Sequence, residues 1–132
     1  MAAFVTTHRL RFNDTDALGH VNNAVFAVMC EQGRSEFAVE AGLPMRGGAQ
    51  SVVIVRLELD FVREMTWPGD VRIETGVQRI GNRSFTCGQR LVHGGEVCGR
   101  AQTVLVVLDR ATGKAAPLDP WREILQRYLE AA

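Results

Sequence analysis

The sequence predicts an α+β fold in which a five-stranded antiparallel sheet wraps around one long central helix, with a short helix near the C-terminus. Three observations support this prediction: a proline-free apolar stretch from Asn23, four long alternating segments after it, and short glycine-containing turns between those segments. The length of 132 residues is typical of one domain, so residues 1–132 are expected to fold as a single unit.

The first strand and the long helix are expected over residues 4–12 and 23–41. Side chains of residues 4–12 alternate with the period of a strand. The helix would have Asn22 or Asn23 as its N-cap and would stop at Gly42. Its first half, AVFAVMC, is apolar on every side, so we expect the helix to be buried rather than laid on a surface.

Four further strands are expected after the helix, over residues 51–63, 71–77, 83–93 and 96–109. The turns WPGD, GN and GG are short, which excludes parallel crossovers and predicts an antiparallel meander. A short helix is expected over Asp119–Leu129, with Asp119 as its N-cap and Pro120 at its first position.

The composition argues against several classes of protein. Fifteen basic and fifteen acidic residues give a formal net charge of zero, so neither a nucleic-acid partner nor membrane binding is expected. No apolar run reaches the roughly 18 residues of a membrane span, and the first residues lack the pattern of a secretory signal. The three cysteines have no CxxC spacing, which predicts neither disulfides nor zinc and indicates a cytoplasmic setting.

The candidate for chemistry is the segment DTDALGHVNN at residues 14–23, directly before the helix. The motifs GxSxG, GxxxxGK, GxGxxG and HExxH are absent from the chain. The segment starts like a calcium loop, but Leu18 and Val25 stand where oxygen ligands are needed. A metal bound by Asp16 and His20 would need a third ligand from elsewhere, so no metal is expected.

The two aspartates of this segment are expected to differ in role. For Asp14 we favour a turn former whose carboxylate bonds nearby backbone amides. Asp16 could form such a turn as well, but it lies just ahead of a helix start with unpaired N–H groups and a positive dipole end. A carboxylate beside such an oxyanion site is what acyl transfer needs.

The stretch RFNDTDALGHVNNAVFAVMCEQGRSEF resembles the signature of hotdog-fold acyl-CoA thioesterases of the 4-hydroxybenzoyl-CoA thioesterase type. The resemblance continues through LELDFVREMTWPGDVRIE, GVQRIGNRSF and VVLDRATGKAAPLDP, and so covers nearly the whole chain. In that family a long helix lies inside an antiparallel sheet, which matches the order of elements expected here. The resemblance implies an enzyme that hydrolyses an acyl-CoA to free acid and CoA without a cofactor.

The resemblance also implies roles for individual residues. The family's catalytic carboxylate corresponds to Asp16, as nucleophile or general base, and the N–H that polarises the carbonyl lies close to Asn23. Three further residues fall on positions that line the substrate entrance, namely His20, Asn22 and Phe26, the last often a tyrosine in the family. Parts of CoA are expected near the segment that contains Arg79, Asn82, Arg83 and Ser84.

Two residues keep alternative interpretations. His20 could order the loop before the helix or polarise the substrate, because neutral imidazole serves both purposes. Glu31 lies on the same helix and could contact substrate as a second acid or base. For Glu31 we favour an ion pair with Arg34 at i,i+3.

Assembly and two other functions complete the expectations. Exposed strand edges invite a partner, and the resemblance implies homodimers that share a continuous sheet, often doubled to homotetramers, with active sites at the subunit boundary. A hotdog hydratase or dehydratase would pair the entry Asp with a His on the helix, and residues 23–41 contain no His. A non-catalytic acyl-CoA-binding module is the other alternative. The nature of the acyl group stays open.

Overall fold

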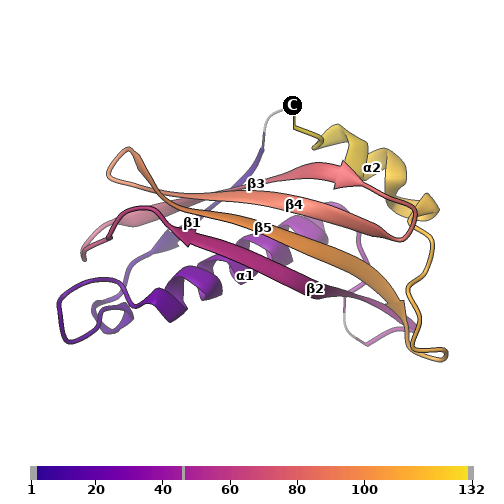
Figure 1. Ribbon diagram of the computed structural model, residues 1–132, viewed down its shortest axis with the longest axis horizontal. Helices are drawn as coiled ribbons and strands as arrows, with labels where there is room; N and C mark the ends of the chain where they lie inside the picture. Colours follow the sequence, from indigo (N-terminus) through magenta and orange to yellow (C-terminus); the bar gives the residue numbers. More distant parts are fainter. Residues whose placement is uncertain (1–2, 46, 131–132) are drawn as a thin grey trace.

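The computed structural model describes residues 3–45 and 47–130. One long helix, α1 (Asn23–Glu40), lies lengthwise along one face of a single sheet, and a short helix, α2 (Arg122–Arg127), sits where β3 turns into β4 (Figure 1). The strands are β1 (Phe4–Arg9), β2 (Gln50–Phe61), β3 (Asp70–Ile80), β4 (Ser84–His93) and β5 (Glu96–Asp109). The predicted α+β class, with five antiparallel strands and a long central helix, is confirmed.

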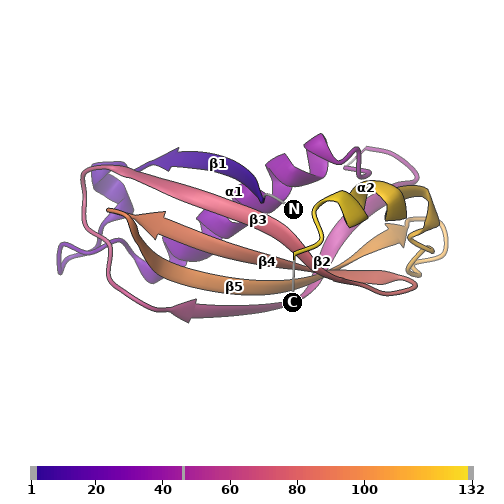
Figure 2. The ribbon, with the colours of Figure 1, turned by 90° about the horizontal axis from the view of Figure 1, so that it is seen from above.

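The strand order is β1-β3-β4-β5-β2, with β1 and β2 at opposite edges (Figure 2). All neighbouring pairs are antiparallel, and β3, β4 and β5 form the expected meander. The meander prediction is wrong for β2, which pairs with β5 and not with β3. The connection over residues 62–69 can reach about 26 Å, whereas three strand spacings are about 14 Å, so it carries the chain past two strands.

Helix α1 begins and ends close to the predicted residues. The Asn22 side chain accepts a hydrogen bond from the Ala24 N–H, as an N-cap does. Gly33, in the middle of the helix, allows close packing: a Cβ there would lie 2.5 Å from Ile73 Cγ2 and 2.8 Å from Gln89 Nε2. A residue that weakens helices in isolation therefore sets how closely α1 approaches β3 and β4.

The helix is buried on one side only. Met29 and Cys30 are fully buried, whereas Val28 and Val39 are 56% and 68% exposed. The expectation that the helix is buried rather than laid on a surface therefore holds for only one side of it in a single chain. Since α1 packs mainly on β1, β3 and β4, the inner face of β5 and β2 beside it is left partly open.

The predicted C-terminal helix is divided into two pieces. A 3₁₀ turn, η2 (Asp119–Trp121), precedes α2, and Leu118 takes the N-cap position without a side-chain cap. The predicted N-cap role of Asp119 is therefore wrong. The reason is an i→i−3 bond from the Trp121 N–H to the Leu118 carbonyl, which tightens the first turn.

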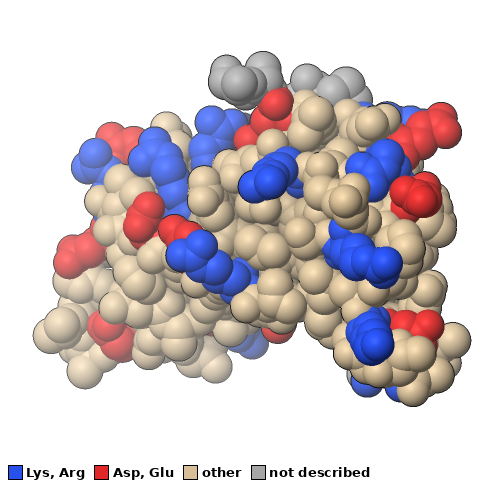
Figure 3. Space-filling view, turned by 45° about the vertical axis from the view of Figure 1, so that its right-hand side comes forward, with Lys and Arg blue, Asp and Glu red and all other residues tan. Residues whose placement is uncertain are grey.

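The surface carries charges of both signs (Figure 3), and the three cysteines lie in the interior. Basic and acidic side chains are interspersed over the face shown in Figure 3. Within the described residues, no helix is both long and apolar enough to cross a membrane. The thiols of Cys30, Cys87 and Cys98 are all buried and free.

Candidate active site

A pocket of about 320 Å³ lies at the start of helix α1. Four residues predicted from the sequence line it: Asp16, His20, Asn23 and Phe26. The opposite wall is formed by residues 61–64, at the end of β2 and just beyond it. Loop, helix start and strand end thus meet at one end of the sheet.

Asp16 is exposed, and one of its two carboxylate oxygens is hydrogen-bonded to the backbone of its own loop. Its Oδ1 accepts hydrogen bonds from the backbone N–H groups of Leu18 at 2.9 Å and His20 at 3.3 Å. Its Oδ2 has no hydrogen-bond donor among residues 3–45 and 47–130. An Asx-type turn therefore fixes the carboxylate and leaves one oxygen free to face a substrate.

The first turn of α1 offers a free backbone donor beside Asp16. The Asn22 side chain occupies the Ala24 N–H at 2.9 Å, and the Val25 N–H bonds to the Asn22 carbonyl. The Asn23 N–H has no acceptor in the described part of the chain, as expected for the first residue of a helix. This N–H lies at the positive end of the helix dipole, where it can bind a partly negative oxygen.

Asp14 has a structural environment. It is 2% exposed and accepts hydrogen bonds from His8 Nε2 at 3.1 Å, from the Arg11 N–H at 2.8 Å and from Arg11 Nη2 at 3.1 Å. Burial raises the pKa of Asp14, but the hydrogen bonds from Arg11 and His8 outweigh it and hold the pKa below its ordinary value. These contacts agree with the favoured interpretation of Asp14, and the contact with His8 has no signal in the sequence.

His20 joins the loop to the opposite wall of the pocket. Its Nε2 lies 3.0 Å from Glu64 Oε2, so the imidazole is oriented by a carboxylate that follows β2. Glu64 belongs to the stretch LELDFVREMTWPGDVRIE, but nothing in that stretch singles it out. No three His, Cys, Asp or Glu side chains of the described residues lie close enough together to hold a metal.

An aromatic pair forms an apolar part of the pocket wall. Phe26 is 2% exposed, and its ring meets that of Phe61 edge-on, with centroids 5.1 Å apart. Because no hydroxyl projects from position 26, this wall can contact an acyl group through apolar contacts only. The pocket combines a free carboxylate oxygen, a free helix N–H and an apolar wall, and this combination suits acyl transfer.

Glu31 is not part of this pocket. It lies farther along α1 and lines a second pocket of about 370 Å³ together with Arg34. The predicted ion pair between Glu31 and Arg34 is wrong, because the described residues contain no such pair within 4.0 Å. Arg34 is instead buried and donates to Gln89 and Thr103 on the sheet.

The segment predicted to contact CoA lies at the other end of the sheet. It forms the turn between β3 and β4, where the Asn82 carbonyl accepts from Leu118 and Arg83 Nη1 donates to the Ala115 carbonyl at 2.8 Å. The length of β3 separates this turn from the Asp16 end by about 30 Å. A single chain therefore does not bring Asp16 together with Arg79, Asn82, Arg83 and Ser84.

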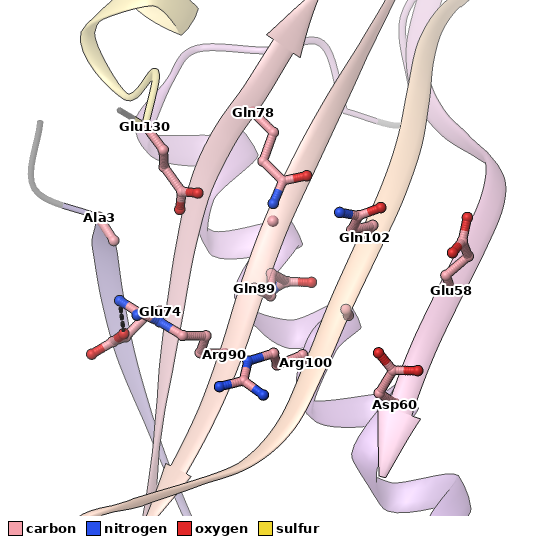
Figure 4. A pocket seen from close by; sticks show the side chains of 12 residues that line it. Ala3, Glu58, Asp60, Glu74, Gln78, Gln89, Arg90, Arg100, Gln102 and Glu130 are labelled. Carbon is pink, nitrogen blue, oxygen red and sulfur yellow. Dashed lines mark ion pairs between the residues drawn. The ribbon is translucent and has the colours of Figure 1, made fainter. Parts of the chain in front are cut away.

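The outer face of the sheet carries a larger hollow of about 620 Å³, seen in Figure 4 with α1 behind the sheet. Gly76 and Gly88 face each other on β3 and β4, and the side chains of Glu130 and Gln78 lie over them. Glu74 binds both Arg72 and Arg90 at 2.7 Å. The hollow faces away from the start of α1, so a carboxylate there has no helix N–H beside it, and we do not place the active site in it.

The chain is similar to known proteins over almost all of its length. It matches the description of the thioesterase-like superfamily over residues 10–127. A 1,4-dihydroxy-2-naphthoyl-CoA hydrolase from Synechococcus elongatus is 30% identical over 136 aligned positions, which cover 98% of this chain and 97% of that protein. The structure of a predicted thioesterase from Bacillus stearothermophilus is 33% identical, with a TM-score of 0.88 over 99% of both chains. A 1,4-dihydroxy-2-naphthoyl-CoA thioesterase from Synechocystis, 21% identical, has the same fold, with a TM-score of 0.82 over 94% of this chain and 96% of its own.

Proposed function

The chain belongs to the thioesterase-like superfamily and is an acyl-CoA thioester hydrolase, and we propose that the pocket at the start of α1 is where it cleaves its substrate. One observation carries this proposal: Asp16, which has a free Oδ2, and Asn23, which has a free N–H, line the same pocket. Acyl transfer needs both a base or nucleophile and a donor for the oxyanion.

The proposed reaction uses these two groups in the cleavage of the C–S bond. The Asn23 N–H donates to the thioester carbonyl oxygen, which becomes negative as the carbonyl carbon is attacked. Asp16 Oδ2 either takes a proton from an attacking water or attacks the carbon itself, in which case water then opens the resulting anhydride. In the direct route water supplies the second carboxylate oxygen of the acid. In the anhydride route that oxygen comes from Asp16, and water opening the anhydride at the Asp16 side restores the aspartate. In both routes the CoA thiolate leaves and is protonated, and the acid is released.

An isotope experiment separates the two routes. In a single turnover in ¹⁸O-labelled water, with enzyme in excess, direct attack by water places the label in the released acid. Attack by Asp16, followed by water at the Asp16 side of the anhydride, places the label in the enzyme. Digestion and mass spectrometry of the peptide that contains Asp16 report which route operates.

We propose an aromatic acyl-CoA as the substrate. The relative from Synechococcus elongatus is named for a naphthoyl-CoA substrate. In this chain Phe61 is half exposed, packs edge-on against Phe26 and offers an apolar ring surface in the same pocket as Asp16. Aromatic rings stack favourably on such a surface, by about 0.5–1.5 kcal/mol beyond the burial of area.

We also propose that two copies pair through β2. This strand is bonded to β5 on one side only, and Ile54 and Val55 are 46% and 60% exposed. A long apolar edge strand of this kind readily accepts a second strand. Antiparallel pairing would place the Arg79–Ser84 turn of one copy at the same end of the joint sheet as Asp16 of the other copy. The residues expected to contact CoA would then lie at the active-site end.

Thiol release from a panel of aliphatic and aromatic acyl-CoAs tests the function. We expect release from at least one aromatic acyl-CoA, and loss of release in Asp16→Asn. Hydration of an unsaturated acyl-CoA without thiol release would indicate a hydratase. Binding of acyl-CoA with neither reaction would indicate a binding module, and either result would overturn the proposal.

A further inference from the structure

Arg34 is a buried cation without a carboxylate partner. It is 7% exposed, and its Nη1 donates to Gln89 Oε1 and Thr103 Oγ1 over long distances of 3.4 Å each. Both acceptors are neutral, and the described residues place no carboxylate oxygen within 4.0 Å of this guanidinium. A buried charge is costly unless it is paired, so this arrangement is unusual for a purely structural residue.

No group around Arg34 forms an ion pair with it among the described residues. The amide of Gln89 is already committed, because its Nε2 donates to the Cys30 carbonyl and to Thr75 Oγ1, both at 3.0 Å. Burial raises the pKa of Cys30 to about 11 and that of Cys87 to about 12, so both thiols are neutral at physiological pH. Glu31, on the same helix and in the same groove, is exposed and lies beyond 4.0 Å, so its charge favours the guanidinium only from a distance.

The guanidinium lies in the wall of a mostly apolar groove of about 370 Å³ between α1 and the inner face of β2 and β5. Its other walls include Ala38, Val52, Ile54 and Leu105. A guanidinium has five N–H donors, and the Nε and Nη2 donors have no acceptor among the described residues. Such a groove fits a flat apolar group that carries an oxygen where it meets Arg34.

Within one chain this groove is far from the catalytic pocket. Arg34 is eleven residues beyond Asn23 on α1, a separation of about 16 Å along the helix axis. A single aromatic ring system attached to a carbonyl held at Asn23 does not span that distance. The groove can serve the reaction only if another catalytic pocket lies nearer to it.

A second copy paired through β2 brings such a pocket. A two-fold axis perpendicular to the sheet keeps the inner faces of both copies on the same side. In full antiparallel overlap of the two strands, Phe61 of one copy lies opposite Gln50 of the other, and a slide of two residues brings it opposite Val52, which faces inward as Phe61 does. The catalytic pocket at Phe61 then adjoins the groove at Val52–Ile54.

We propose that Arg34 of one subunit binds an oxygen substituent of the acyl group whose thioester is cleaved at Asp16 of the other subunit. The substrate class is therefore an aromatic acyl-CoA whose ring carries a hydroxyl or another oxygen acceptor. This inference rests on the function proposed above. It makes Arg34 a specificity-determining residue, because it recognises the ring oxygen and does not touch the reacting bond.

Matched substrates test the recognition of the ring oxygen. We expect Arg34→Met to lower kcat/KM for 1,4-dihydroxy-2-naphthoyl-CoA by about 10- to 100-fold, the range for loss of a hydrogen bond to a charged group. The same variant should leave kcat/KM for 2-naphthoyl-CoA close to wild type. The control Arg100→Met removes an exposed arginine on the outer face and should change neither value.

Three results would overturn the recognition of the ring oxygen. These are equal losses on both substrates, no loss on either, and a wild type without preference for the hydroxylated ring. Arg34→Met should fold at least as well as wild type, because it removes an unpaired buried charge. If it does not fold, Arg34→Lys retains the charge but lacks the planar fork and should show the same selective loss.

A mixed dimer tests the arrangement across subunits. In the proposed dimer each site takes Asp16 from one chain and Arg34 from the other. A dimer of one Asp16→Asn chain and one Arg34→Met chain therefore has one site with both substitutions and one site with neither. Random mixing of the two chains should then restore about a quarter of wild-type activity on the hydroxylated substrate. If the mixture shows only the residual activity of Arg34→Met, the cross-subunit arrangement is wrong.

These tests separate failure of this inference from failure of the proposed function. A wild type that releases thiol from neither naphthoyl-CoA, nor from any other acyl-CoA, would contradict the proposed function itself. Release that depends on Asp16 but is indifferent to Arg34 would leave the function standing and remove the role of Arg34.

Discussion

Replacement of Asp14 by asparagine should cost stability without removing activity, although Asp14 is only two residues from Asp16. The Asp14 carboxylate is buried and accepts three hydrogen bonds, two from Arg11 and one from His8. Asparagine can accept at one oxygen only, so at least one bond to a charged group is lost, which costs about 1.5–3 kcal/mol. At this chain length each kcal/mol lowers Tm by about 3–5 °C, so we expect Tm to fall by about 5–15 °C.

The assay is thermal unfolding of both proteins as a function of pH, with thiol release measured well below Tm. Because the folded pKa of Asp14 is below its ordinary value, its charge stabilises the fold above the unfolded pKa, and that stability is lost as the pH falls through the folded pKa. The difference in Tm should therefore be full at neutral pH and shrink below about pH 4. An unchanged Tm at neutral pH, or lost turnover in folded Asp14→Asn, would refute this reasoning.

Three further predictions concern packing, assembly and the thiols. Gly33→Ala should destabilise the fold by about 1–3 kcal/mol in denaturant titrations, because the added Cβ would lie 2.5 Å from Ile73 Cγ2; an unchanged midpoint would show that the helix can shift. Val55→Lys should convert dimers to monomers in light scattering and reduce thiol release, since it adds a charge to the β2 edge; a dimer with full activity would contradict pairing through β2. Cys30 and Cys87 should resist thiol reagents at pH 8 until the protein unfolds, because burial raises their pKa values to about 11 and 12; rapid labelling of folded protein would contradict this.

Local patterns in the sequence predict most of the secondary structure. The period of two in the strands, the glycine turns and the asparagine at the helix entry are all local, so β2, β4, β5 and α1 lie close to their predicted ranges. The place of β2 beside β5 is not local, because the same alternating residues could pair at either edge of the meander. The one-sided burial of α1 depends on the same placement, since apolar composition alone does not say which face stays open.

The candidate site also has a part that local sequence predicts and a part that depends on the tertiary fold. The sequence predicts the residues of one short segment around the helix entry, namely Asp16, His20, Asn23 and Phe26. Their opposite wall comes from the end of β2, and Glu64 acquires its contact with His20 only when the chain crosses the sheet. From the sequence, Arg34 is expected to form an ion pair with Glu31 at i,i+3. Only the packing of α1 on the sheet shows that Arg34 is buried.

Thiol release by Asp16→Asn, measured beside wild type and Asp14→Asn, tests the proposed active site most directly. Asparagine keeps an oxygen for the turn bonds from Leu18 and His20, so the fold and Tm should be almost unchanged. Loss of the positioned carboxylate should lower kcat at least about 100-fold, the lower end of the range for a general base. Turnover at the wild-type rate by folded Asp16→Asn would contradict the assignment of the active site to the start of α1.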